Sequence, residues 1–161
     1  MIFIYLLICI IILSIFKELV YFIKPYRVVL ISTQTKYITP ILTQIINDFI
    51  KNTNNENFVE IGSGYSKVTR YMAKNYKWHK MIAIEINLLL VYAMRILNIF
   101  KKLPIQYVQA NIFNYKLPEN AVIYAYMSPK IIDEVYKRQQ LKNCIFISLT
   151  FKLQDVEPTK V

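Results

Sequence analysis

Apolar residues in this chain form one long run at the N-terminus and then short blocks separated by helical patterns. The first sixteen residues carry no charged side chain, and after Lys17 and Glu18 the apolar run resumes and continues to Ile23. As a helix, the uncharged part would be about 24 Å long and the whole run about 34 Å, against a hydrocarbon core of about 30 Å. We therefore expect one transmembrane helix over residues 1–23, with the membrane bilayer as its partner.

Positive side chains follow this run and do not precede it. The first are Lys17, Lys24, Arg27 and Lys36. A cleaved signal peptide would have a basic residue before the run and small residues after it, and this chain has neither. By the positive-inside rule, the globular part should face the cytoplasm. The sequence thus predicts a single-pass membrane protein with an anchor at 1–23, a connector at 24–36 and one cytoplasmic domain at 37–161.

Within residues 37–161, helical and extended patterns alternate. Thr39 and Pro40 are typical of an N-cap and a first helical residue, and an apolar stripe at helical spacing follows them. Strands that are short apolar runs, separated by helices, indicate an α/β fold with a single parallel sheet covered on both faces. We expect strands at 58–61, 81–86, 105–109, 121–127 and 144–150, and helices at 66–76, 88–101 and 129–141.

The first of these strands leads into a turn with two glycines, Gly62 and Gly64, on either side of Ser63. Such a turn lets a ligand approach the backbone, and the free amides of the next helix face that ligand. A phosphate-binding P-loop is excluded because the Gly-Lys-Ser/Thr end is missing. A nicotinamide or flavin site would favour a third glycine at the position of Lys67, so this turn fits another cofactor better.

Acidic and amide side chains follow the ends of three strands. Glu60 lies beside the glycine turn, where a negative charge opposes a pyrophosphate and suits an ammonium and a sulfonium, as in S-adenosylmethionine. Glu85 ends the second strand and could accept both hydroxyls of a ribose. Asn111 follows the third strand and could bond the adenine edge. The alternatives are exposed strand-end carboxylates and a loop-capping Asn.

These residues resemble the motifs of class I S-adenosylmethionine-dependent methyltransferases. The segment 60–64 is similar to their motif I, Glu85 to the acidic residue after their second strand, and Asn111 to the Asp that is usual after their third. The resemblance implies a Rossmann-like fold, an enzyme, and S-adenosyl-L-methionine as the cofactor. Glu60, Gly62, Ser63, Gly64, Glu85 and Asn111 would then bind the cofactor.

A narrower resemblance is to small membrane-anchored protein lysine methyltransferases. It covers residues 37–158 and is carried by the segments 37–40, 60–64, 84–87 and 151–158. Eukaryotic members of this family modify mitochondrial inner-membrane proteins, including the ATP synthase c subunit and the adenine nucleotide carrier. The resemblance implies that the substrate is a lysine of a membrane or membrane-proximal protein.

The chain departs from the family pattern at several points. Tyr65 and Ser66 replace the acidic residue and the third glycine that are common in the family's loop, and Asn111 replaces an Asp. The chain also stops after its fifth predicted strand, so the C-terminal antiparallel hairpin of these enzymes is lacking or abbreviated. A non-catalytic, membrane-tethered interaction module is therefore one alternative function, and an enzyme acting on a lipid or a quinone is another.

On the acceptor side, this fold places the substrate after the fourth strand. Tyr126 and Ser128 are therefore the candidate catalytic residues that would orient the amine, while core packing and helix capping are their alternative roles. Neither cysteine is placed for a disulfide, and the single histidine lies in a loop, so no metal site is expected. The net charge of +10 suits an acidic partner, but the lysines are dispersed, and no specific nucleic-acid binding is expected.

Overall fold

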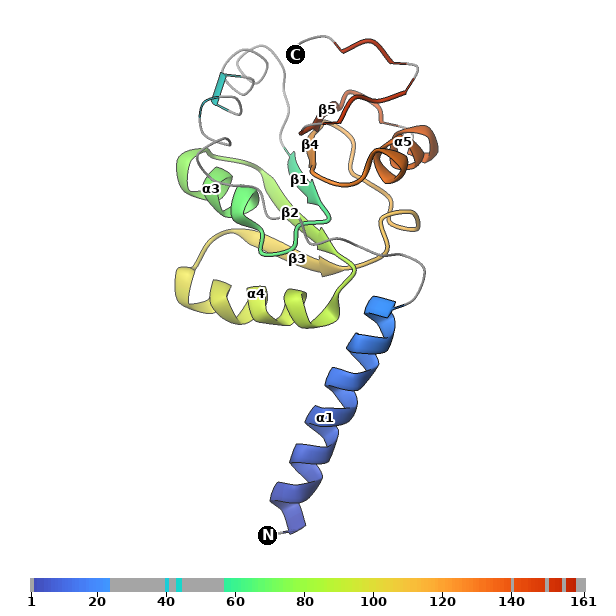
Figure 1. The fold of residues 1–161 in the computed structure, drawn as a ribbon. Coiled ribbons are helices and arrows are strands. Elements are labelled where there is room, and N and C mark those ends of the chain that lie inside the picture. Colours follow the sequence, from blue (N-terminus) through green and yellow to red (C-terminus); the bar gives the residue numbers. More distant parts are fainter. Residues whose placement is uncertain are drawn as a thin grey trace.

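The chain is described here from a computed structural model, drawn in Figure 1. The structure describes residues 2–23, 40, 43–44, 57–139, 141–149, 151–154 and 156–158. The predicted connector at 24–36 and nearly all of the predicted helix that begins at Pro40 lie outside these residues.

The N-terminal run forms helix α1, Ile2–Ile23. Among the described residues, no helix is both long and apolar enough to cross a membrane, so the predicted transmembrane helix is not supported.

A five-stranded parallel sheet is the centre of the domain, in the order β3-β2-β1-β4-β5. The strands are β1 (Asn57–Ile61), β2 (Lys80–Glu85), β3 (Ile105–Gln109), β4 (Ala121–Ala125) and β5 (Ile145–Ser148). All four pairings are parallel. The predicted Rossmann-like α/β fold is therefore confirmed, and within the described residues no antiparallel hairpin follows β5.

Helices cover both faces of this sheet (Figure 1). Helices α3 (Lys67–Asn75) and α4 (Leu88–Lys101) pack on one face, where Met72 and Val91 join a core with Phe58 and Tyr124. Helix α5 (Pro129–Arg138) packs on the other face, where Ile132 and Val135 join a second core with residues of the β3–β4 connection. The central strands β1 and β4 are buried almost throughout, which explains their unbroken apolar sequences.

Several predicted elements end one to three residues earlier in the structure than the sequence indicated, and β4 and α5 are two of them. Strand β4 ends at Ala125 rather than at 127, and the chain bends at Met127, which lines the pocket described below. Helix α5 ends at Arg138 rather than at 141. Its next residue, Gln139, is extended, and its side-chain amide donates to the Tyr115 carbonyl at 2.8 Å and to the Ile112 carbonyl at 3.3 Å. Gln139 thereby fastens the β3–β4 connection to α5.

Candidate functional site

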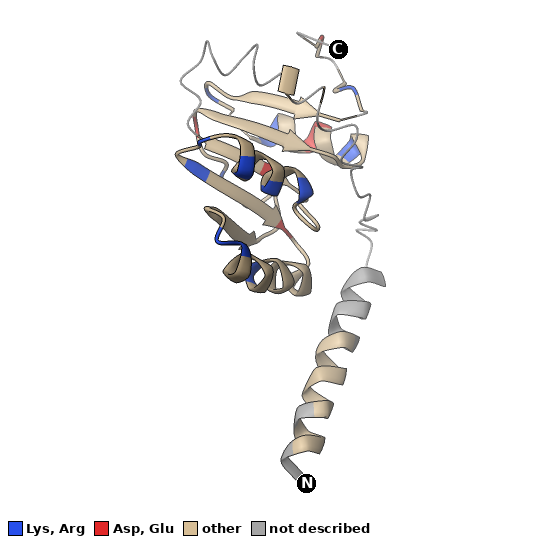
Figure 2. Ribbon diagram, turned by 90° about the vertical axis from the view of Figure 1, so that its left-hand side faces the viewer, with Lys and Arg blue, Asp and Glu red and all other residues tan. Residues whose placement is uncertain are grey.

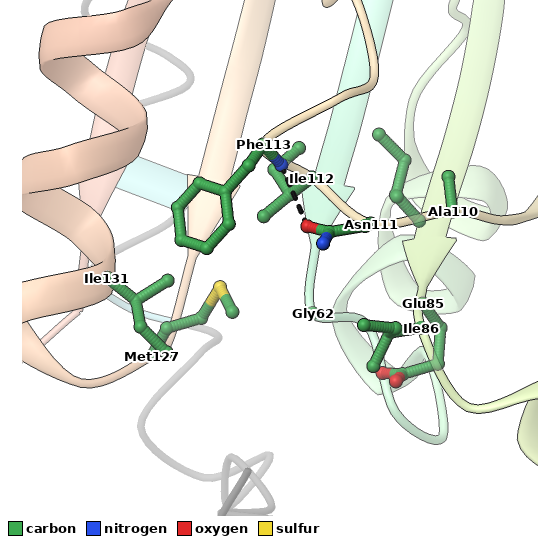
Figure 3. Close-up of a pocket in the computed structure, with 10 residues that line it drawn as sticks. Gly62, Glu85, Ile86, Ala110, Asn111, Ile112, Phe113, Met127 and Ile131 are labelled. Carbon is green, nitrogen blue, oxygen red and sulfur yellow. Dashed lines mark hydrogen bonds between the residues drawn. The ribbon is translucent and has the colours of Figure 1, made fainter. Parts of the chain in front are cut away.

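An open pocket lies at the carboxyl ends of the central strands, which is where open parallel sheets bind ligands (Figure 3). The empty space in it, including the solvent at its mouth, is about 510 Å³. Residues from the ends of β1, β2, β3 and β4 and from the start of α5 form its walls: Gly62, Ile84, Glu85, Ile86, Ala110, Asn111, Ile112, Phe113, Met127 and Ile131.

The glycine turn after β1 forms one side of the pocket. Gly62 and Gly64 have φ angles of +64° and +50°, a left-handed region that glycine adopts without steric strain. The amide of Ser63, between them, donates to the Ile84 carbonyl at 2.9 Å, and its carbonyl accepts from the Ser66 amide at 2.7 Å. The turn is therefore held on both sides, against β2 and against the start of α3.

Glu85, at the end of β2, is the acidic residue of the pocket wall. Its carboxylate is only 4% exposed. One oxygen accepts from the Gly64 amide at 2.8 Å and the other accepts from the Asn87 amide at 2.9 Å. Each carboxylate oxygen can accept more than one hydrogen bond, so both retain capacity for a ligand hydroxyl. The structure thus joins Glu85 to the glycine turn, and its role in binding a ribose stays a prediction.

Asn111 also lines the pocket, and its side chain has a defined orientation (Figure 3). Its Oδ1 accepts from the Phe113 amide at 3.0 Å. Because an N–H donor needs an oxygen acceptor, this bond fixes which end of the amide faces Phe113. This bond is the loop-capping contact that the sequence offered as the alternative role of Asn111. The residue also lies at the pocket wall, so the two roles are compatible. Its Nδ2 is the end of the side chain that remains for a ligand.

Apolar side chains complete the pocket. Ile86 lies next to Glu85, while Ile112 and Phe113 lie next to Asn111 (Figure 3). Met127 and Ile131 form the opposite wall, on the side of α5. A flat aromatic ligand would find apolar contacts here, next to the few polar groups that fix its orientation.

Glu60 lies elsewhere than the sequence suggested, because it does not line the pocket. Its carboxylate is 5% exposed and accepts from the Thr69 amide at 2.9 Å and from the Thr69 hydroxyl. Thr69 is the third residue of α3, whose N-cap Ser66 makes no side-chain capping bond. Glu60 therefore caps this helix from a distance, with its carboxylate at the positive end of the helix dipole.

Burial changes the protonation of Glu60. Desolvation raises its pKa from 4.5 to about 7, opposed by the two bonds from Thr69 and by the nearby Arg70, while the charge of Glu85 raises it further. Because of this raised pKa, Glu60 supplies less negative charge near neutral pH than an exposed glutamate does. Glu85 is the acidic group that faces the pocket itself.

Neither candidate catalytic residue contributes to the pocket wall. Tyr126 is partly buried and packs against the core beneath α3 and α4. Ser128 is exposed at the N-cap of α5, where its carbonyl accepts from the amides of Ile131 and Ile132 at 3.0 and 3.1 Å. Its hydroxyl makes no capping bond. Met127, between the two, is the residue that reaches the pocket.

Replacing Gly62 with Ala should impair ligand binding more than folding. A Cβ at this position would lie 3.0 Å from Sδ of Met127, and an L-residue at this φ is strained by about 1–2 kcal/mol. The flexible Met127 side chain would move aside into the space of the pocket. We expect a destabilisation of about 1–2 kcal/mol in urea unfolding, together with a loss of affinity in calorimetric titration with S-adenosylhomocysteine. The double variant with Met127→Ala should recover part of the affinity, and equal losses in both variants would contradict this account.

Comparisons with known proteins identify the fold. The chain is similar to an RNA methyltransferase from Salinibacter ruber in complex with S-adenosyl-L-homocysteine, with a TM-score of 0.65 and 15% identity over 81% of this chain and 84% of that one. An S-adenosylmethionine-dependent methyltransferase from Clostridium acetobutylicum gives a TM-score of 0.57 and 12% identity over 84% and 56% of the two chains. A dimethyladenosine transferase from Plasmodium falciparum gives 0.51 and 18% over 68% and 41%.

This chain therefore has the fold of class I S-adenosylmethionine-dependent methyltransferases. It spans most of the first of these structures and about half of the other two. No family model and no curated protein matches the sequence.

The structure unites part of the predicted site and adds residues that the sequence did not indicate. Gly62, Glu85 and Asn111 lie in one pocket, with Ser63 and Gly64 in the turn beside them. Phe113 is one of the apolar residues beside Asn111 in the segment after the third strand, whereas Ile131, an apolar residue of α5, had no signal in the sequence. Met127 could have been found only from its contact with Gly62.

Proposed function

We propose that this protein is an S-adenosylmethionine-dependent methyltransferase. The observation that carries the proposal is the carboxylate of Glu85, buried at the end of β2 and held by the amides of Gly64 and Asn87. A rigid acceptor pair beside a glycine turn suits a ribose with two free hydroxyls. The fold supports the same ligand, since the similar structures include a methyltransferase in complex with S-adenosyl-L-homocysteine.

The residues of the pocket fit the three parts of this cofactor. Glu85 would hold the ribose, and Asn111 with Ile86 and Ile112 would hold the adenine. The turn from Gly62 to Gly64 would lie against the amino acid part, because its glycines leave the backbone accessible. The buried Glu60 would act indirectly, by fixing the start of α3 behind that turn.

When bound, S-adenosylmethionine supplies an activated methyl group, which passes from its sulfonium to a nucleophile as the S–C bond breaks. The protein contributes alignment and exclusion of water. A lysine acceptor must first lose its proton, which desolvation near the site favours. Within this proposal, Tyr126 and Ser128 orient the amine from the end of β4, next to the pocket residue Met127.

Conservative variants test this acceptor role. Tyr126→Phe and Ser128→Ala should each lower the rate of methyl transfer by about tenfold to a hundredfold, because each loses one group that positions or accepts from the amine. Affinity for S-adenosylhomocysteine should not change, since neither side chain lines the pocket. An unchanged rate in both variants would remove these residues from the catalytic assignment.

For the acceptor, we propose a lysine of a protein at or in a membrane. The support is the resemblance to membrane-anchored lysine methyltransferases, together with the exposed large apolar side chains that the structure describes in α1: Ile4, Tyr5, Leu6, Ile8, Ile10, Ile11, Ile12, Leu13 and Ile15. Such a helix would hold the domain at a bilayer, and the confinement would raise the effective concentration of membrane substrates. The positive residues after α1 favour a cytoplasmic position of the domain.

Two measurements separate this proposal from its alternatives. Titration of the purified full chain with S-adenosylhomocysteine should give a saturable heat of binding, and a folded protein without such heat would favour a non-catalytic interaction module. Membranes incubated with the protein and methyl-labelled S-adenosylmethionine should carry the label on lysine in protein. Label in the lipid extract instead would indicate an enzyme that acts on a lipid or a quinone.

A further inference from the structure

Helix α4 exposes a continuous apolar face on the side that points away from the sheet. Val91 and Met94 are buried beneath the helix. On the opposite side, residues three or four positions apart share one face of the helix. This outer face consists of the large side chains Leu88, Leu89, Tyr92, Ile96, Ile99 and Phe100. The most exposed are Ile99 at 71% and Phe100 at 77%.

The other two helices on the sheet do not share this property. Helices α3 and α5 bury one face and expose polar side chains on the other, as surface helices normally do. A helix that is apolar on all sides is normally buried on all sides. The outer face of α4 is therefore expected to be covered by something outside the residues that the structure describes.

The charged residues of α4 and of the segment that follows it, up to Pro118, are all positive. No carboxylate occurs between Ile86 and Pro118, a segment that contains α4 and β3. Lys101 and Lys102 lie at the C-terminal end of the helix, and Figure 2 shows basic and no acidic residues on this helix. The Arg95 guanidinium lies 5.8 Å from the centre of the Tyr92 ring and donates to the Tyr107 carbonyl, so its charge is fixed beside the outer face.

We propose that the outer face of α4 rests on the surface of a bilayer that contains acidic lipids. An apolar helix face with lysines at its margin and aromatic side chains within it is suited to the boundary between headgroups and acyl chains. Acidic headgroups complement Lys101 and Lys102, and no carboxylate in the segment opposes them. Because α4 begins three residues after Glu85, this docking would place the rim of the pocket beside the lipid surface.

A site-specific probe on the full chain tests this contact separately from α1. Cys9 and Cys144 are first replaced with Ser, and a single cysteine is introduced by Ile99→Cys and labelled with an environment-sensitive fluorophore. The matched control carries the label at Lys74→Cys, an exposed position of α3. The vesicles contain phosphatidylcholine with phosphatidylserine, and a quencher is attached near the headgroup end of an acyl chain.

The probe at position 99 should brighten with these vesicles and be quenched by the labelled lipid, whereas the probe at position 74 should show neither change. Quenching at 99 should decrease when Lys101 and Lys102 are both replaced with Gln. The proposal is overturned if the protein floats with the vesicles while the probe at 99 stays unquenched. It is also overturned if that probe becomes shielded with rising protein concentration in the absence of vesicles, which would show that a second copy covers the face.

Discussion

Replacing Glu85 with Ala is expected to weaken binding of S-adenosylhomocysteine by about a hundredfold or more, because two charge-assisted hydrogen bonds of about 1.5–3 kcal/mol each are lost. The side chain is buried at the pocket wall, and no neighbouring carboxylate of the pocket takes over its role. Calorimetric titration of the full chain measures the affinity. Since product and cofactor share the ribose, the Michaelis constant for S-adenosylmethionine should rise in parallel.

The same substitution also leaves the amides of Gly64 and Asn87 without their acceptor. These groups are only partly buried, so water can replace the carboxylate at a cost of about 1–2 kcal/mol in stability. Unfolding followed through Trp78, the single tryptophan, would show that the variant remains folded. Glu119→Ala is the matched control, because it removes the same charge from an exposed position at the other end of the strands. A folded Glu85→Ala protein with unchanged affinity would refute the ribose assignment.

The sheet could be predicted from the sequence because its strands are short, largely apolar segments and most of them are separated by helices. Strand β3 was predicted to the residue, and α4 likewise, since Asn87 is a strong N-cap whose side chain accepts from the Leu90 amide at 3.1 Å. The order of the strands in the sheet was not predictable from the apolar pattern, because that pattern does not indicate which strands pair with one another. The early end of α5 depends on bonds from Gln139 to carbonyls more than twenty residues away.

The site was predictable where a residue type is dictated by the backbone. The positive φ angles at these two turn positions favour glycine, which is the residue at Gly62 and Gly64. Glu85 is the last residue of β2, and the only other charged residue of that strand is its first, Lys80. The direction of a strand-end side chain was not predictable in the same way. Glu60 and Glu85 occupy similar places in the sequence, yet Glu60 turns toward Thr69 and Glu85 toward the pocket. Which partner a carboxylate meets depends on the packing of α3.

Glu60 makes the stability of the domain depend on pH in a direction that can be measured. Its pKa is 4.5 in the unfolded chain and about 7 in the fold. Because the folded pKa is raised, the contribution to stability is fully present below pH 4.5 and is lost as the pH rises through about 7. The shift in pKa corresponds to about 3 kcal/mol in the free energy of unfolding. This loss of stability is complete once the pH is above the pKa of Glu60 in the fold.

Glu60→Gln should therefore stabilise the protein by about 1–3 kcal/mol at pH 8 and have little effect at pH 4.5, because a neutral amide still accepts from Thr69 without a buried charge. Urea unfolding at a series of pH values, followed through Trp78, measures both effects. The charges nearest to Glu60 are Arg70, which favours the ionised form, and Glu85, which opposes it, while Tyr107 is a further titratable neighbour. Glu119→Gln should leave the pH profile as it is in the parent protein. If the parent and Glu60→Gln give parallel profiles between pH 5 and 8, Glu60 does not titrate in this range, and its capping of α3 would then be that of a fully ionised carboxylate.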